Sequence, residues 1–508
     1  MKKIISFVLC IILLVGILPS FSVSAADYSG AETAFITAVL DGESSLNLKK
    51  YNITVSQLAE IEKNMYYRYP ETHHYYYNCN YNYSGNYVTK ISSFNYKNGH
   101  DKDSIYDSLV SLYTTAYTII YSMPDGLSDL EKALYLHDWI ATYYKYDMDY
   151  YKINGQPNYT VYELFTEGKG VCQAYSFAYH LLLRECGIES KWVRSNEEDN
   201  HSWNLVKIGG RWYHVDITHD DPIVSEDSNA AVDFLGQAMH RKFLLSDAQI
   251  NDGLHDGWYD PLGSNITCSA YSGGSIWKEA DSSMVYTGGY WYYLDYQKGG
   301  LVRTDRNFST SQLLATLDKK WYYNGGADYY SGYYSGMAAY NGRIFYSDWK
   351  SLYSYDIDTG KVDEIAHLTN TNNGVFFGFI MSGTAFNLLS TTNIYSKYTS
   401  SNSNVFYYEL CLDTDTNEIS HEDKFLAWKY YGEGQIYDCD LCGTILDFSE
   451  ELYGDANGDT IINTTDLATL KLYLAGISNS YIFADIDRNG ELDTSDLASL
   501  KLKLAGIY

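Results

Sequence analysis

Proline and positive charge are both scarce in this sequence. Only 6 of its 508 residues are proline, so long proline-rich linkers are excluded. Lys and Arg number 36 against 64 Asp and Glu, which gives a formal net charge of −28. This balance argues against nucleic acid and anionic membranes as partners, because both attract Lys and Arg. It favours solubility and the binding of hard cations instead.

Long hydrophobic runs are missing beyond the N-terminus. There, Lys2 and Lys3 precede an apolar stretch from Ile4 to Leu18, and small residues follow at 22–26. This order is typical of a secretory signal peptide. No later stretch is apolar for long enough to span a bilayer. We therefore expect residues 1–26 to be a signal peptide and the mature protein to be secreted.

The cysteine count is unusual for an exported protein. One of the 8 cysteines, Cys10, lies in the predicted signal peptide, so an odd number remains and at least one thiol is free. Cys439 and Cys442 form a lone C-x-x-C pair. Without a second pair at metal spacing, we interpret it as a local disulfide or two free thiols rather than a zinc site. Cys172 is the leftover thiol of most interest.

Helical and strand patterns divide the chain. Its length predicts about three domains. Helices are expected at 31–40 and 56–67, and a tyrosine-rich alternating stretch at 75–96 predicts a β-hairpin. A helix should restart at Ser128, whose side chain can cap it while Glu131 completes a capping box.

Residues 270–425 have the pattern of an all-β region. An aromatic strand followed by a turn and a second strand recurs around Tyr293, Tyr346 and Tyr407, at a pitch of about 50 to 60 residues. A degenerate repeat of this kind predicts propeller-like blades or, alternatively, a β-sandwich.

Two segments near the C-terminus, 455–466 and 485–496, align without gaps. Each carries Asp or Asn at positions 1, 3, 5, 9 and 12, the spacing with which a tight loop surrounds calcium with oxygen ligands. The predicted calcium ligands are Asp455, Asn457, Asp459, Asn463 and Asp466 in the first loop, and Asp485, Asp487, Asn489, Asp493 and Asp496 in the second. Thr460 stands where the first loop prefers glycine, so that site should bind calcium more weakly.

A leucine-rich helix pattern follows each loop, and no helix of EF-hand length precedes it. Loop-then-helix, repeated twice, resembles a type I dockerin domain over residues 452–508. The resemblance implies two bound Ca²⁺ ions, docking onto a cohesin domain of a scaffoldin, and membership of a cellulosome that degrades plant polysaccharides. It assigns cohesin recognition to Thr464, Thr465, Lys471, Thr494, Ser495 and Lys501. The similarity of the two halves implies two alternative docking orientations.

A Cys, a His and an Asp occur with spacings suited to nucleophilic catalysis. Cys172 follows a glycine-rich loop and opens a helix pattern, where the helix dipole favours a thiolate. Gly209 and Gly210 predict a hairpin turn that pairs residue 208 with 211. That register makes His201 and Asp216 diagonal neighbours, within reach of a hydrogen bond. A thiolate, a base and an orienting acid are the parts needed for acyl transfer.

Two alternatives stay open on spacing alone. His214 lies on the same predicted strand face as Asp216 and could be the base instead of His201. Each of these residues could also be an ordinary buried polar group, because Cys at a helix start and His or Asp in a hairpin are common one at a time.

The motifs G-V-C-Q-A-Y at 170–175, H-S-W-N at 201–204 and R-W-Y-H-V-D-I-T at 211–218 resemble the bacterial transglutaminase-like domain, which has a papain-like α+β fold. The match covers roughly 105–265. It implies Cys172 as the nucleophile, His201 as the base and Asp216 as the third member of a triad, with no cofactor. Hydrolysis of protein or peptide amide bonds is favoured, while transfer to an amine stays open.

The resulting prediction is a multidomain, secreted enzyme associated with a cellulosome. A non-catalytic module that binds protein or carbohydrate is the alternative, and a glycosidase is disfavoured because no motif singles out a pair of carboxylates. The predicted order is a signal peptide (1–26), an N-terminal helical and β-hairpin segment (27–104), the transglutaminase-like domain (105–265), the β-repeat region (270–425), a linker (426–451) and the small all-α dockerin domain (452–508).

Overall fold

The structure is a computed structural model. It describes residues 29–147, 158–195, 201–222, 236–317, 321–322, 329–330, 336–348, 351–367, 375–382, 385–391, 405–411, 436–438, 445–447, 467, 469–471, 474 and 494–504. The predicted signal peptide and the Cys439–Cys442 pair lie outside these ranges. Among the described residues, no helix is both long and apolar enough to cross a membrane.

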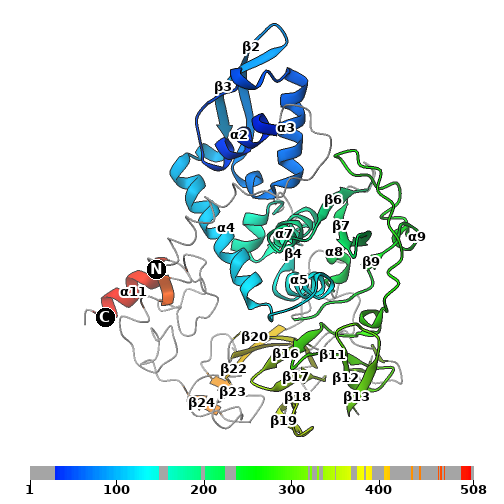
Figure 1. Ribbon diagram of the computed structural model, residues 1–508. Coiled ribbons are helices and arrows are strands. Elements are labelled where there is room, and N and C mark those ends of the chain that lie inside the picture. Colours follow the sequence, from blue (N-terminus) through cyan, green and yellow to red (C-terminus); the bar gives the residue numbers. More distant parts are fainter. Residues whose placement is uncertain are drawn as a thin grey trace.

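The N-terminal segment combines two helices with a small sheet (Figure 1). Its helices are α2 (Ser29–Leu40) and α3 (Val55–Arg68), and its strands β1 (Leu46–Asn47), β2 (Tyr76–Ser84) and β3 (Tyr87–Tyr96) form an antiparallel sheet in the order β1-β3-β2. Short 3₁₀ turns occur at Lys49–Tyr51, Pro70–His74 and Lys97–Gly99. Phe35, Leu58 and Ile91 share one buried core. Both predicted helices and the predicted hairpin are confirmed.

A central helix, α7 (Cys172–Glu185), is the scaffold of the next region. It packs against α5 (Asp129–Tyr143), α6 (Val161–Glu167) and strand β7 (Ser202–Ile208). Residues 174–183 of this helix are all buried, as expected for a helix covered on every side. The other elements here are α4 (Lys102–Ser122), α8 (Ile217–Asp220), α9 (Asp247–Ile250) and the short parallel pair β4 (Lys145–Tyr146) and β5 (Lys169–Gly170).

The sheet beside α7 is antiparallel. Its order is β6 (Ser190–Arg194), β7, β8 (Arg211–Val215) and β9 (Phe243–Leu245). Gly209 and Gly210 form the turn between β7 and β8 with φ of 58° and 79°, and Ile208 pairs with Arg211. Positive φ at both positions is the requirement of a tight hairpin turn, which glycine meets without strain. The predicted register of this hairpin is confirmed.

Helix α5 begins with the predicted capping box. The Ser128 hydroxyl accepts a hydrogen bond from the Glu131 backbone N–H at 3.4 Å, and Glu131 Oε2 accepts one from the Ser128 N–H at 2.8 Å. The same carboxylate also accepts hydrogen bonds from Arg306 and from the indole of Trp291. The start of α5 is therefore held by the region that follows it in the chain.

The middle of the chain consists of separate antiparallel sheets. The first is a meander of β10 (Val285–Thr287), β11 (Tyr290–Asp295), β12 (Gly300–Thr304) and β13 (Ser311–Thr316). The second repeats it with β16 (Met337–Tyr340), β17 (Arg343–Ser347), β18 (Ser351–Asp356) and β19 (Val362–His367). Further sheets contain β20 (Val375–Ser382), β21 (Ala385–Thr391) and β22 (Val405–Cys411), then β14 (Trp321–Tyr322) with β15 (Tyr329–Tyr330), and β23 (Ile436–Asp438) with β24 (Ile445–Asp447).

The repeat inferred from the sequence corresponds to these meanders. Tyr293, Tyr346 and Tyr407 lie in β11, β17 and β22. The two four-stranded meanders also share a register shift between their third and fourth strands, after Leu301 in one and after Leu352 in the other. Closure of the sheets into a propeller or a sandwich stays a prediction.

The two central strands of the first meander, β11 and β12, are buried on both faces. Trp291, Tyr293 and Val302 belong to the large core that also contains α5 and α7. Tyr292, Leu294 and Leu301 alternate with them and pack against the second meander. The period-two alternation of a strand thus divides its side chains between two cores. A 3₁₀ turn at Ile276–Glu279 places Trp277 in the larger one.

Near the C-terminus, helix α11 (Thr494–Leu504) packs through Leu500 on Leu470, both fully buried. Leu467, Leu474, Leu497 and Leu504 complete this small core. Of the predicted calcium ligands only Asp496 is among the described residues, and its side chain is buried. Of the predicted recognition residues, Lys471, Thr494 and Lys501 are exposed, while Thr464 and Thr465 lie outside the described residues.

Candidate active site

Cys172 is the first residue of α7. Val171 precedes it without a side-chain cap, so the N–H groups of the first turn are not occupied by a capping side chain. Gly170 approaches the helix closely, since a Cβ there would lie 2.7 Å from Ala174 Cβ. Gly168 ends α6 with φ of 72°. The glycine-rich loop seen in the sequence therefore brings α6 back beside the start of α7.

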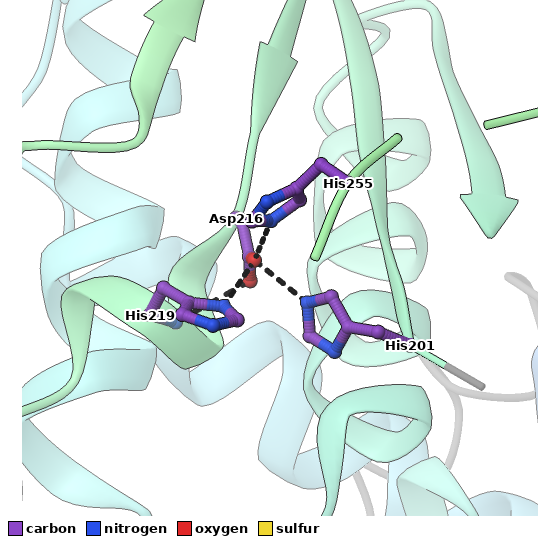
Figure 2. A group of neighbouring side chains, drawn as sticks. All are labelled: His201, Asp216, His219 and His255. Atoms are coloured by element: carbon purple, nitrogen blue, oxygen red, sulfur yellow. Dashed lines mark hydrogen bonds and ion pairs between the residues drawn. The ribbon is translucent and has the colours of Figure 1, made fainter. Parts of the chain in front are cut away.

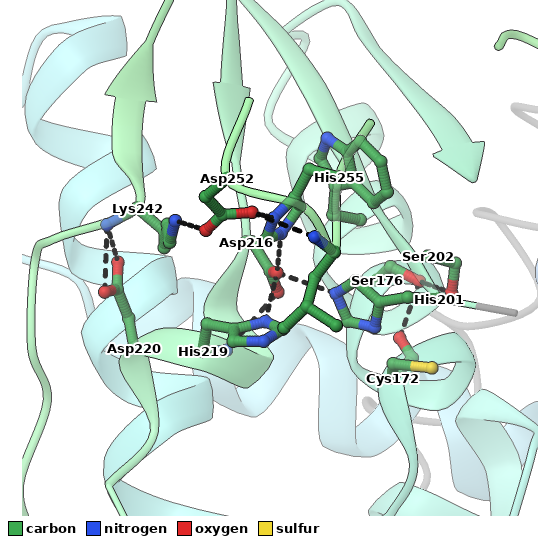
Figure 3. A network of polar contacts seen from close by, with 12 residues as sticks. Cys172, Ser176, His201, Ser202, Asp216, His219, Asp220, Lys242, Asp252 and His255 are labelled. Atoms are coloured by element: carbon green, nitrogen blue, oxygen red, sulfur yellow. Dashed lines mark hydrogen bonds and ion pairs between the residues drawn. The ribbon is translucent and has the colours of Figure 1, made fainter. Parts of the chain in front are cut away.

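His201 and Asp216 meet across the ends of β7 and β8. His201 Nε2 lies 2.7 Å from Asp216 Oδ2. His201 immediately precedes β7 and Asp216 immediately follows β8, so the hairpin register alone brings them together. Because Nε2 is bound to Asp216, Nδ1 is the nitrogen left for Cys172 (Figure 3).

A serine pair joins α7 to β7. Ser176 Oγ donates to the Cys172 carbonyl at 2.7 Å and lies 3.3 Å from Ser202 Oγ. The side-chain amide of Asn204 donates to the Ser176 carbonyl at 2.9 Å. These bonds fix the first turn of α7 against the strand that follows His201, which sets the separation of Cys172 and His201.

The pKa values of the three groups move in the directions that an ion pair needs. Burial would raise the pKa of the Cys172 thiol, but hydrogen bonding to His201 and its charge lower it. Burial would lower the pKa of His201, yet the carboxylate of Asp216 and the thiolate raise it to about 10. The pKa of Asp216 lies well below its usual value, against the effect of burial, because His201, His219 and His255 all contact it. Both shifts favour a thiolate beside an imidazolium.

Two further histidines contact Asp216, and the sequence did not reveal them. His219 Nδ1 lies 2.6 Å and His255 Nε2 2.8 Å from the same Oδ2 atom that binds His201 (Figure 2). His219 follows Asp216 by three residues in α8, whose N-cap is Asp216, so the D-I-T-H spacing was a usable signal. His255 comes from a loop between α9 and the β-repeat region, and no local pattern marks it.

His214 occupies a separate site. Its Nδ1 accepts the indole N–H of Trp203 at 2.9 Å, and its Nε2 lies 2.9 Å from Asp247 Oδ1. Burial lowers the pKa of His214 to about 4, although Asp247 acts in the other direction. Of the two histidines that the sequence left open as the base, His201 is the one beside Asp216.

A second buried network lies behind the site. His137 contacts Asp138 at 2.8 Å and Asp220 at 3.2 Å, and His240 contacts Asp138 at 2.8 Å. Asp138 also accepts the backbone N–H of Met284 at 2.7 Å, at the edge of the first meander. Burial would lower the pKa of His137, but the two carboxylates raise it to about 9.

Three clusters of His with Asp or Cys bring ligand-type atoms within 4.8 Å of one another in the described part of the chain. They centre on Asp216, Asp138 and Asp247. In each cluster imidazole nitrogens pair with carboxylate oxygens at hydrogen-bond distance. This is the pattern of hydrogen-bonded networks, and we treat all three as such.

Comparison with known families matches two parts of the chain. Residues 121–217 match the model of the transglutaminase-like superfamily, and residues 453–505 match the type I dockerin domain. The chain therefore contains a transglutaminase-like domain and a type I dockerin domain, as the resemblances implied. The first match includes Cys172, His201 and Asp216. No curated protein matches the chain.

Two solved structures align with parts of the chain at low structural similarity. A chain titled "Crystal structure of a TGase" is 13% identical, with a TM-score of 0.20, and the alignment covers 24% of this chain and 34% of that one. A chain of an S. cerevisiae Dbp5 complex with Nup159, Gle1, IP6 and ADP is 7% identical, with a TM-score of 0.19, and the alignment covers 44% of this chain and 46% of that one. Both scores are too low to indicate a shared overall fold.

Proposed function

We propose that this protein is a secreted, cellulosome-associated cysteine enzyme that hydrolyses or transfers peptide or side-chain amide bonds. Cys172 is the nucleophile, His201 the base and Asp216 the residue that orients His201. The observation that carries the proposal is the 2.7 Å contact of His201 Nε2 with buried Asp216, beside a helix-terminal cysteine whose thiol pKa is lowered. This arrangement has the three parts that acyl transfer requires.

The reaction follows from these positions. His201 holds the proton that it has taken from the Cys172 thiol, and the resulting thiolate attacks the amide carbonyl carbon. The C–N bond then breaks, and the amine leaves with the proton from His201. Water or a second amine then attacks the thioester carbon and gives up a proton to His201. The C–S bond breaks, and the Cys172 thiolate beside the His201 imidazolium is restored. Asp216 holds the imidazole in position and stabilises its positive charge.

The dockerin domain is the tether in this proposal. Two Ca²⁺ ions order its loops, and Thr464, Thr465, Lys471, Thr494, Ser495 and Lys501 recognise a cohesin. The burial of Asp496 at the start of α11 and the packing of Leu470 on Leu500 fit a carboxylate that faces a loop-bound cation. The predicted signal peptide and the propeller-like or sandwich packing of 270–425 belong to the same proposal.

A binding role for the chain has one observation in its favour. The hairpin of β2 and β3 exposes Tyr77, Tyr83 and Tyr87, at 69%, 65% and 52% of their surface. Exposed aromatic rings suit contact with protein or sugar. In this alternative the hairpin binds, and the buried His and Asp residues serve only the fold.

Thiol labelling distinguishes the enzyme from the binding role, and other free cysteines of the chain serve as internal controls. Cys79 and Cys186 are also free, and burial raises their pKa values to about 12 and about 11. We expect iodoacetamide at neutral pH to label Cys172 first, and His201→Ala to abolish that preference. Equal and slow labelling of all three thiols would support the binding role and rule out the enzyme.

The tether is tested with the full chain and an immobilised type I cohesin. Binding should require calcium, vanish with chelator and return when calcium is restored. Binding that persists in chelator would contradict the calcium-dependent tether without affecting the catalytic proposal.

A further inference from the structure

His255 is completely buried, and both of its ring nitrogens face carboxylates. Nε2 lies 2.8 Å from Asp216 Oδ2, and Nδ1 lies 2.6 Å from Asp252 Oδ1. A carboxylate only accepts hydrogen bonds, whereas a neutral imidazole has a single N–H to donate. Both contacts are satisfied together only when His255 carries a proton on each nitrogen and is positively charged.

The charge on His255 is balanced along a chain of contacts that ends at the surface. Asp252 pairs with the ammonium group of Lys242 on its other side (Figure 3), and its side chain is 35% exposed. Asp216 is 1% exposed and accepts His255, His201 and His219 at one oxygen. The series runs Lys242, Asp252, His255, Asp216, His201, and so reaches the base that we assign to Cys172.

We propose that Asp252 and His255 are positioning residues that set the pH range in which Cys172 and His201 form their ion pair. This inference rests on the proposed function. His255 acts through Asp216 and does not touch the thiol. Asp252 keeps the second proton on His255, so that one carboxylate, Asp216, is shared between two imidazolium groups.

The positive charge of His255 affects the ionisation of Cys172 and His201 in a definite direction. The His201 and His255 ring centres are 5.3 Å apart. A second cation at that distance favours the thiolate of Cys172. It also makes the His201 imidazolium easier to deprotonate. Loss of the His255 charge should therefore make the thiol harder to ionise and the imidazolium harder to deprotonate. Both limits of the reactive pH range should move upward together.

Other charged groups around the site do not replace His255. His219 contacts Asp216, but its side chain is 33% exposed and its second nitrogen has no carboxylate partner among the contacts described. His214 lies nearby, but its Nδ1 is occupied by the Trp203 N–H. Among the histidines that contact Asp216, His255 is the one held between two carboxylates.

The sharpest test replaces Asp252, which touches neither Asp216 nor His201. In Asp252→Asn an amide N–H can donate to Nδ1, and His255 then no longer needs its second proton. The matched control is Asp247→Asn, which alters the carboxylate partner of buried His214 in the same sheet. The iodoacetamide labelling rate of Cys172 in the full chain is measured against pH for both variants and the wild type.

We expect the midpoint of the Cys172 labelling profile to rise in Asp252→Asn, by up to roughly one pH unit, because the lost His255 charge is nearer to the site than the lost Asp252 charge that partly offsets it. It should not move in Asp247→Asn. A purely structural role for Asp252 would lower the rate at every pH without moving the midpoint. An unchanged midpoint in a folded Asp252→Asn protein would overturn the inference.

His255→Gln provides a second variant, since it keeps one N–H for Asp216 but cannot carry the charge. It should shift the midpoint in the same direction as Asp252→Asn. If both variants titrate like the wild type, the positioning role is wrong while the triad stands. If wild-type Cys172 reacts no faster than Cys186, the proposed function itself is wrong.

Discussion

The indole N–H of Trp203 donates a hydrogen bond to Nδ1 of His214 over 2.9 Å. The lone pair of that nitrogen is thereby used, and Nε2 must carry the proton that it donates to Asp247. His214 is then a neutral imidazole with no free basic nitrogen. One indole thus decides which of two nearby histidines is available as a base.

The first prediction compares these histidines. His201→Gln removes the imidazolium beside Cys172 and should lower its iodoacetamide labelling rate at neutral pH by on the order of 100-fold, as the thiol returns to the behaviour of a buried cysteine. His214→Gln should leave the rate within about twofold of the wild type. Mass spectrometry of the labelled peptide measures both. Equal effects of the two substitutions would mean that His201 has no special role.

The second prediction concerns pH. The lowered pKa of Cys172 means that its labelling rate should level off at a lower pH than that of an ordinary thiol. Burial raises the pKa of Cys186 to about 11, so its thiolate fraction and labelling rate should rise about tenfold per pH unit over the same range. Rates for the two peptides from one sample provide the comparison. Parallel profiles would contradict the ion pair.

The third prediction tests the buried ion pair that joins the N-terminal segment to α7. Arg184 Nη2 lies 2.9 Å from Glu71, whose side chain is 1% exposed. Arg184→Ala leaves that buried carboxylate without its cation and with the Tyr113 hydroxyl as a neutral donor, which should cost about 3 kcal/mol of unfolding free energy. Urea denaturation measures the loss.

The control for this buried ion pair is Lys102→Ala, which removes an exposed one. Lys102 forms an ion pair with Glu43 at 2.8 Å, but the two side chains are 62% and 47% exposed. Water screens such a pair, and its removal should leave the denaturation midpoint unchanged. Similar losses in both variants would show that burial does not set the strength of these pairs.

The fourth prediction concerns calcium. Asp496 stands at position 12 of the second predicted loop and is buried at the start of α11. Asp496→Asn should weaken calcium binding at that loop by about tenfold or more, because a hard cation prefers a charged oxygen ligand. Calorimetric calcium titration of the full chain measures the change. Substitution of exposed Lys471 should weaken cohesin binding and leave the calcium titration unchanged.

The sequence predicted those features that depend on local spacing. The hairpin register follows from Gly209 and Gly210, and it places His201 beside Asp216. The capping box at Ser128 and Glu131 follows from a three-residue interval. Such signals are local, since the interacting groups are a few residues apart or joined by one tight turn.

The features that the sequence did not predict depend on contacts between distant segments. His255 reaches Asp216 from a loop with no periodic pattern, and Asp252 in the same loop contacts His255. Arg306 and Trp291 reach Glu131 from another sheet. Only the packing of complete elements brings these groups together, and a single sequence contains no spacing that specifies it. The predicted calcium ligands other than Asp496 lie outside the described residues, so their roles stay predictions.

The shared core of α5, α7 and the first meander limits how this protein can be divided. A chain cut at residue 265 would lose Trp277, Trp291 and Phe308, which belong to the same core as α5 and α7, and would leave Glu131 without Arg306. The newly exposed apolar surface would make such a fragment prone to aggregation. A fragment used in domain shuffling or recombinant expression would therefore need to extend at least through β13, well beyond the family match at 121–217.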